Sequence, residues 1–143
     1  MRFQRDGLQF EYPDDWSIDV DADADGVAEV TALSPEGGFW SVSVHPSSAD
    51  PLQLTRAIVD EMRRQYDDID VEPAGESIEG RELRGHDFNF YCLDLTNTAT
   101  VRAIRSPAAI HLVLCQAEDR EWKRVAPVFS AMTTSLVRGL PRG

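Results

Sequence analysis

Lysine is almost absent from this sequence, and basic residues of either kind are missing from a long stretch near its start. Of the 14 basic residues only Lys123 is a lysine, and none falls between Arg5 and Arg56, a segment that holds eleven acidic residues. With 25 acidic residues in all, the chain carries a net charge of −11 at pH 7. Binding to nucleic acid or to an anionic membrane surface requires a positive patch, so we expect neither as a partner.

Long apolar runs are also missing. The chain has no run of about 18 apolar residues, the length that crosses a bilayer, and Met1–Gly7 lacks the apolar core of a secretion signal. We therefore expect a cytoplasmic protein. The 143 residues predict a single domain over 1–143. Folding a chain of this length removes about 68–70% of its unfolded surface from water. The core is therefore large enough to stabilise the fold without disulfides.

Cysteine is scarce, since only Cys92 and Cys115 are present. Each lies in an apolar, strand-like run, which predicts a reduced and buried thiol. A cross-strand disulfide is the alternative, and it requires the two runs to be neighbours in the sheet.

Signatures of catalysis are missing as well. The sequence contains neither the G-x-S-x-G motif of hydrolases nor the Walker A motif that binds phosphates. It also lacks the G-x-G-x-x-G motif that binds dinucleotides and the C-x-x-C motif. Its three histidines, His45, His86 and His111, lie on different predicted strands without the spacing of metal ligands. We therefore predict no enzyme activity, no catalytic residue and no cofactor.

One acidic segment matches part of a metal-binding motif. Asp21, Asp23, Asp25 and Gly26 agree with the first six positions of a calcium-binding EF-hand loop. The twelfth position, which should supply a bidentate glutamate, is Ala32. The three aspartates are therefore only a candidate calcium site, and an acidic, solvated hairpin loop is the other interpretation.

What the chain does contain is a regular succession of strand and helix patterns. Alternating residues predict strands at 8–12, 17–20, 27–33 and 39–45, a helix from Asp50 to about Asp68, further strands from about Ile69 to Ala117 and a closing helix from about Glu118 to Gly139. Short links favour antiparallel neighbours, so we predict an α+β fold: an α/β sandwich with a mainly antiparallel sheet flanked by two main helices. The strand at 110–115 is apolar on both faces, which is typical of a central strand.

Both helices carry local signals of their own. Asp50 can cap the first helix, whose buried stripe is predicted to be Leu54, Ile58, Val59, Met62 and Tyr66. Asp60 and Arg64 are spaced for an ion pair on its outer face. In the closing helix, the predicted stripe is Trp122, Val125, Phe129, Met132 and Leu136. Pro127 predicts a kink or a fresh start near Ala126.

The segment from Phe10 to Trp16, which reads F-x-Y-P-x-x-W, is the most distinctive part of the chain. Pro13 should end a strand, and Trp16 should fold back over the core. Together with the helix start at Asp50 and the ending at Phe129 and Ser135-Leu136, it resembles the superfamily of the photosystem protein PsbP, the Mog-type Ran-binding import factor and bacterial relatives. The resemblance implies a PsbP/Mog-like fold over nearly the whole chain and a non-enzymatic accessory or binding role.

Arginines give the second half of the chain its positive charge. Arg81, Arg84, Arg102 and Arg105 fall within or beside predicted strands. We expect them to pair with acids on neighbouring strands, and a site for an anionic ligand or an acidic peptide is the alternative.

Two function classes follow from these observations. The first is a non-catalytic accessory or protein-binding module, a monomer or weak homo-oligomer that holds a protein partner. The second is a small-ligand-binding protein or cryptic enzyme with a pocket between sheet and helix. A deep pocket with converging titratable groups favours the second, and an exposed apolar patch favours the first.

Overall fold

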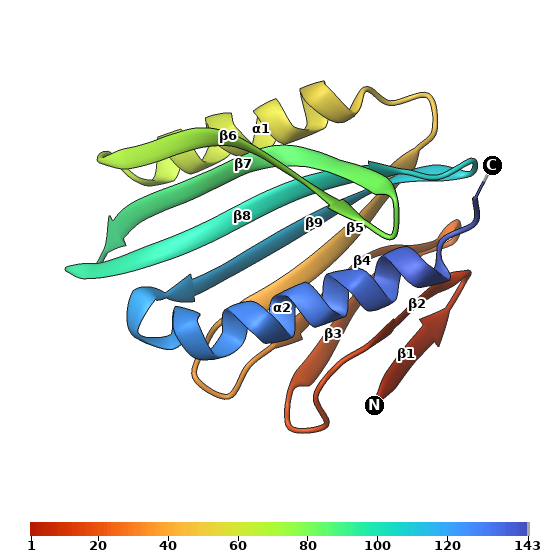
Figure 1. Cartoon of the computed structure of the whole chain (residues 1–143), viewed down its shortest axis with the longest axis horizontal. Helices are drawn as coiled ribbons and strands as arrows, with labels where there is room; N and C mark the ends of the chain where they lie inside the picture. Colours follow the sequence, from red (N-terminus) through yellow and green to blue (C-terminus); the bar gives the residue numbers. More distant parts are fainter. Residues whose placement is uncertain (143) are drawn as a thin grey trace.

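The computed structural model describes residues 1–142, which form nine strands and two helices. In chain order these are β1 (Arg2–Arg5), β2 (Leu8–Glu11), β3 (Ser17–Asp23), β4 (Gly26–Leu33), β5 (Phe39–Pro46), α1 (Pro51–Gln65), β6 (Ile69–Ile78), β7 (Arg81–Cys92), β8 (Leu95–Arg105), β9 (Ala109–Glu118) and α2 (Asp119–Gly139), as Figure 1 shows. No helix among these residues is both long and apolar enough to cross a membrane.

Seven strands form one sheet in the order β3-β4-β5-β9-β8-β7-β6, and all neighbours are antiparallel. This arrangement confirms the predicted α+β architecture. β9 is the central strand, as its apolar faces predicted. Ile110 and Leu112 are buried on the face that packs against α1, whereas Val113 and Cys115 are buried on the face that packs against α2. The two helices therefore cover opposite faces of the sheet.

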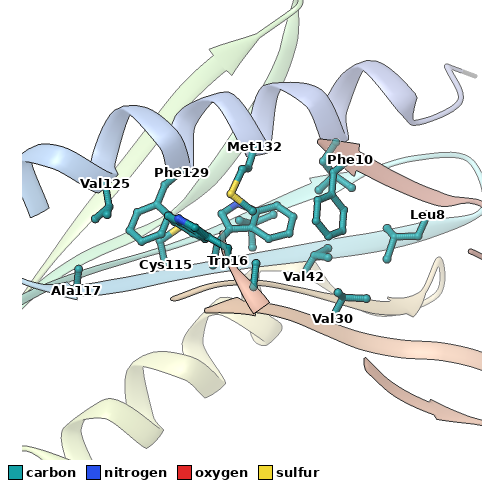
Figure 2. Close-up of a cluster of buried hydrophobic side chains, with 14 residues drawn as sticks. Leu8, Phe10, Trp16, Val30, Val42, Cys115, Ala117, Val125, Phe129 and Met132 are labelled. Atoms are coloured by element: carbon teal, nitrogen blue, oxygen red, sulfur yellow. The ribbon is translucent and has the colours of Figure 1, made fainter. Parts of the chain in front are cut away.

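The core under α2 contains the aromatic anchor predicted from the opening segment. Figure 2 shows Phe129 and Met132 pointing from α2 into this cluster. Trp16 is 8% exposed, and its ring lies edge-on to Phe129 with centroids 5.7 Å apart. The strand before it, β2, ends at Glu11, ahead of Pro13. The predicted strand stop and the return of the indole to the core are both confirmed.

The pairing of β1 with β2 is a feature that the sequence interpretation missed. The two strands form a separate two-stranded sheet joined by Asp6 and Gly7, both at positive φ (52° and 82°). Phe10 of this hairpin is 1% exposed, and its ring lies 4.6 Å from that of Trp40. Because an aspartate-glycine pair is a strong signal for a two-residue hairpin turn, the residues before β2 could have been assigned to a strand.

The first helix begins as predicted. The Asp50 side chain accepts a hydrogen bond from the Leu52 amide at 3.0 Å, and Pro51 occupies the first turn. Val59 and Met62 are buried against the sheet, while the other predicted stripe residues, Leu54, Ile58 and Tyr66, are partly buried in the same cluster.

Two details of the helices differ from expectation. The predicted Asp60–Arg64 pair is wrong, because Arg64 pairs with Glu61, three residues away on an exposed face. The predicted restart of the closing helix near Ala126 is also wrong, since α2 continues through Pro127. Pro127 is exposed, so water can bond the carbonyl that the proline leaves without a donor.

Candidate functional site

The acidic segment considered for calcium forms a tight hairpin between β3 and β4. Asp23 closes the turn by accepting a hydrogen bond from the Asp25 amide at 2.8 Å, and Gly26 has a φ of 115°. Asp21 lies on the strand opposite Glu29, next to an irregularity in the register. In the part of the chain that the structure describes, no group of three or more His, Cys, Asp or Glu side chains could hold a metal ion.

The three histidines occupy three different strands. His111 of β9 is opposite Val44 in the register, so it faces the α2 side of the sheet, whereas His45 faces the α1 side with His86. Burial, with Arg81 and His45 nearby, lowers the pKa of His111 from 6.5 to about 4. Burial also lowers the pKa of His45, against the opposing charge of Glu29.

The two cysteines are free thiols on opposite faces of the sheet. Cys92 at the end of β7 is half-buried in the cluster under α1, and Cys115 of β9 is buried in the cluster under α2. β8 lies between their strands. A cross-strand disulfide between the two cysteines would require β7 and β9 to be neighbours, and they are not. Burial raises the pKa of the Cys115 thiol to about 12, which keeps it protonated.

Of the four arginines expected to pair across strands, only Arg102 pairs with an acid on a neighbouring strand. Arg102, 9% exposed, donates to Asp87 Oδ1 at 2.8 Å and lies 3.8 Å from Glu76. It also donates to the carbonyl oxygen of His86 at 3.1 Å. His86 lies opposite Pro73, which has no backbone N–H to donate. The Arg102 guanidinium supplies a hydrogen-bond donor to the His86 carbonyl instead.

The other three arginines make simpler contacts. Arg84 pairs at 3.0 Å with Glu82 of its own strand, not with an acid on a neighbouring strand. Arg81 donates instead to backbone carbonyls, including that of Leu140 at 3.1 Å, and so ties the β6–β7 turn to the end of α2. Arg105 donates to the Ser47 carbonyl at 2.8 Å. For Arg81, Arg84 and Arg105 the expected pairing with acids on neighbouring strands is therefore wrong.

An exposed apolar tip stands at the turn between β7 and β8, and the sequence interpretation missed it. Tyr91, Leu93 and Leu95 are 64%, 91% and 36% exposed. Leu93 and Asp94 both have positive φ, 53° and 64°, a conformation in which leucine is rare. The run from Phe90 to Leu95 is apolar apart from Asp94, a pattern that in the sequence is typical of a buried strand.

A rigid base supports this apolar tip. Phe90, one residue before Tyr91, is 3% exposed, and its ring lies 4.2 Å from that of Tyr66 at the end of α1. On the other strand, Asn97 is buried and its side chain donates to the Leu95 carbonyl at 3.0 Å. The turn is therefore held at its base while its own side chains remain in solvent.

Acidic residues flank the apolar tip at this end of the sheet, which lies on the left of Figure 1. Asp67 and Asp68 precede β6, the neighbour of β7, and both are exposed. On the β8 side, Glu118 stands opposite Asn97, and Asp119 accepts a hydrogen bond from Thr98 at 2.6 Å. With Asp94 itself, the tip carries negative charge around apolar side chains, partly offset by Arg120, which pairs with Glu118.

A groove lies between α1 and the sheet. Its wider part is a cavity of about 750 Å³ beside the first turn of the helix, lined by residues of α1, β6, β7 and β8. Arg84, Arg105 and His86 are among the lining residues, together with Asp50 and Glu82.

Comparison with known proteins identifies the fold. No family model and no curated protein sequence matches this chain. Among solved structures, a Pseudomonas aeruginosa protein of unknown function, PA94, matches with a TM-score of 0.57 and 14% identity, over 100% of this chain and 97% of its own. Cyanobacterial PsbP from Synechocystis matches with a TM-score of 0.59 and 14% identity, over 94% of this chain and 89% of its own.

A Bacteroides thetaiotaomicron protein matches over 91% of this chain and 46% of its own, with a TM-score of 0.60 and 13% identity. At these identities the likeness concerns the fold, not the activity. The chain has a PsbP-like α+β fold, as the resemblance of its opening segment implied.

Proposed function

We propose that this protein is a non-catalytic protein-binding module that acts in the cytoplasm, and that its contact surface is the apolar tip formed by Tyr91, Leu93 and Leu95. The single observation that carries the proposal is the near-complete exposure of Leu93, at 91%, between two other exposed apolar residues. Exposed apolar clusters rimmed by polar residues are characteristic of protein contact sites.

The chemistry of the tip defines the partner. Because acids flank the apolar side chains on both sides, a complementary partner presents an apolar cleft rimmed by lysine or arginine. Burying one leucine side chain contributes about 2 kcal/mol, so losing Leu93 should weaken such a complex by about 30-fold.

The test is affinity capture from the native cell with quantitative mass spectrometry, comparing wild type with Leu93→Ser. A matched control is Leu33→Ser, which removes another exposed leucine (39%) from β4, away from the tip. We expect one stoichiometric partner with wild type and the control, and its loss with Leu93→Ser. Binding of the purified partner should also weaken as salt is raised, since the acids contribute through charge.

Two outcomes would overturn the proposal. Equal recovery of the same partner by Leu93→Ser and Leu33→Ser would mean that the tip is not the contact surface. Recovery of no stoichiometric partner by wild-type protein would mean that the chain does not act as a binding module in that cell.

A further inference from the structure

The groove beside α1 continues beyond its wider cavity. A second hollow of about 340 Å³ follows the helix, and Pro73 and His86 line both parts. The two parts therefore form one groove, defined here as the α1 groove, between α1 and strands β6 to β8. The volume of its wider part falls in the range of small-molecule sites, roughly 300–1,000 Å³.

Cationic side chains gather on the α1 groove although the chain as a whole is strongly acidic. Arg56 and Arg63 are seven residues apart on α1, about two turns, and both line the narrower part. Within residues 1–142 neither has a carboxylate oxygen within 4.0 Å. The same holds for Arg105 at the other end, whose contact is a backbone carbonyl.

Three acids also line the groove, and two of them are engaged locally. Asp50 caps α1 through the Leu52 amide, and Glu82 pairs with Arg84. Asp60 lies on the exposed side of α1 between the two unpaired arginines. Around the narrower part, two arginines therefore face a single free carboxylate.

His86 lies where the two parts of the groove meet. Its Nδ1 atom is buried and has no hydrogen-bond partner among the described residues. Burial lowers the pKa of His86, and the charges of Arg102, Arg56 and Arg63 lower it further, against the opposing effect of Asp87. The field at this ring is thus positive, and the ring is neutral at pH 7 with a nitrogen left to be bonded.

The walls of the wider part are largely apolar. Leu52 is 54% exposed on this side of α1, and Pro73, Ala74 and Ala103 lie across from it. An exposed leucine beside prolines and alanines can contact the apolar part of an organic ligand.

We propose that the α1 groove binds a small organic anion, with its carboxylate or phosphate group against Arg56 and Arg63 beside His86, and its apolar body over Leu52 and Pro73. Guanidinium groups suit both oxyanions because they donate parallel hydrogen bonds as well as charge. The net charge of the chain repels anions only weakly at this range, since salt screens distant charges within about 10 Å. This site does not depend on the proposed protein-binding function.

The experiment uses the full chain and phenyl phosphate, which combines an oxyanion with an apolar ring. Amide chemical shifts followed by NMR should change at Gly75, Gly85 and His86, with a dissociation constant in roughly the millimolar range. Inorganic phosphate should bind more weakly because it lacks the ring, and benzyl alcohol should not bind because it lacks the charge. Changing both Arg56 and Arg63 to Gln should weaken phenyl phosphate binding about tenfold or more.

The matched control is Arg64→Gln, an exposed arginine beside Arg63 that pairs with Glu61 outside the groove. It should leave the affinity unchanged, as should Leu93→Ser at the apolar tip. Equal weakening by Arg64→Gln, shifts confined to other surfaces or no binding of phenyl phosphate at millimolar concentration would each overturn the proposal. So would binding of an acidic peptide to the groove in the absence of any binding by phenyl phosphate.

Discussion

Arg102 of β8 and Gly85 of β7 stand directly opposite each other in the sheet, and the Arg102 guanidinium crosses β7 at this glycine. It reaches the His86 carbonyl and Asp87 on the far side of Gly85, and its Nε lies 3.8 Å from Glu76 on β6. At Gly85 the backbones of β7 and β8 approach so closely that an added Cβ would meet the backbone of Val101, so only glycine fits opposite this buried arginine.

Gly85→Ala should destabilise the fold by about 3 kcal/mol, because the added methyl group has no room and the strands must separate. The new Cβ would overlap the Val101 carbonyl oxygen and lie 2.8 Å from its carbonyl carbon. Gly75→Ala on the neighbouring strand is the control, since its nearest contact is 3.3 Å. Urea unfolding measures both, and similar losses of stability for the two variants would contradict this account.

His111 predicts how stability depends on pH. Its pKa falls from 6.5 to about 4 on folding, so between these values the unfolded chain binds the proton and the folded chain does not. Stability is therefore full above pH 6.5 and declines as pH falls toward 4, by up to about 3 kcal/mol for this group. The lowered pKa values of His45 and His86 act in the same direction. Urea unfolding across this range should show a shallower decline for His111→Gln, and an identical decline would refute the assignment.

The two thiols should differ in reactivity. Cys115 is 4% exposed and has a pKa of about 12, whereas Cys92 is only half-buried. Because the thiolate is the reacting form, native protein should show one thiol that reacts with Ellman's reagent and a second that reacts only on unfolding. Cys92→Ser should remove the native reaction, and a remaining native reaction in that variant would show that Cys115 is reached without unfolding.

The sheet and both helices could be predicted because their sequence patterns are local and consistent. Period-two alternation located the strands, and the apolar residues on both faces of β9 placed it at the centre. The turn at Asp6-Gly7 was overlooked, so β1 was missed. The partner of Arg64 was misjudged because three- and four-residue spacings are both in reach on a helix, and rotamers select between them.

The candidate sites were harder to predict because they depend on contacts between distant segments. In the α1 groove, Arg56 and Arg63 of the helix lie near His86 of β7. These residues are close together only because of the order of the strands in the sheet, which the local sequence does not determine. The apolar tip has a local sequence, but exposure is not a local property. A run such as Phe90 to Leu95 is indistinguishable from a buried strand until its position beyond the edge of α1 is known.

Leu93 has a backbone conformation that leucine disfavours. Its effect on stability can therefore be measured separately from its proposed role in binding a partner. With φ at 53° for Leu93 and 64° for Asp94, the turn suits asparagine and glycine. Leu93→Asn and Asp94→Gly should each raise stability by about 0.5–1 kcal/mol in urea unfolding. Only Leu93→Asn removes apolar surface, so it alone should weaken capture of the partner. A loss of stability in both variants would show that the turn is not strained, and equal partner binding by both would show that the exposed leucine is not the contact.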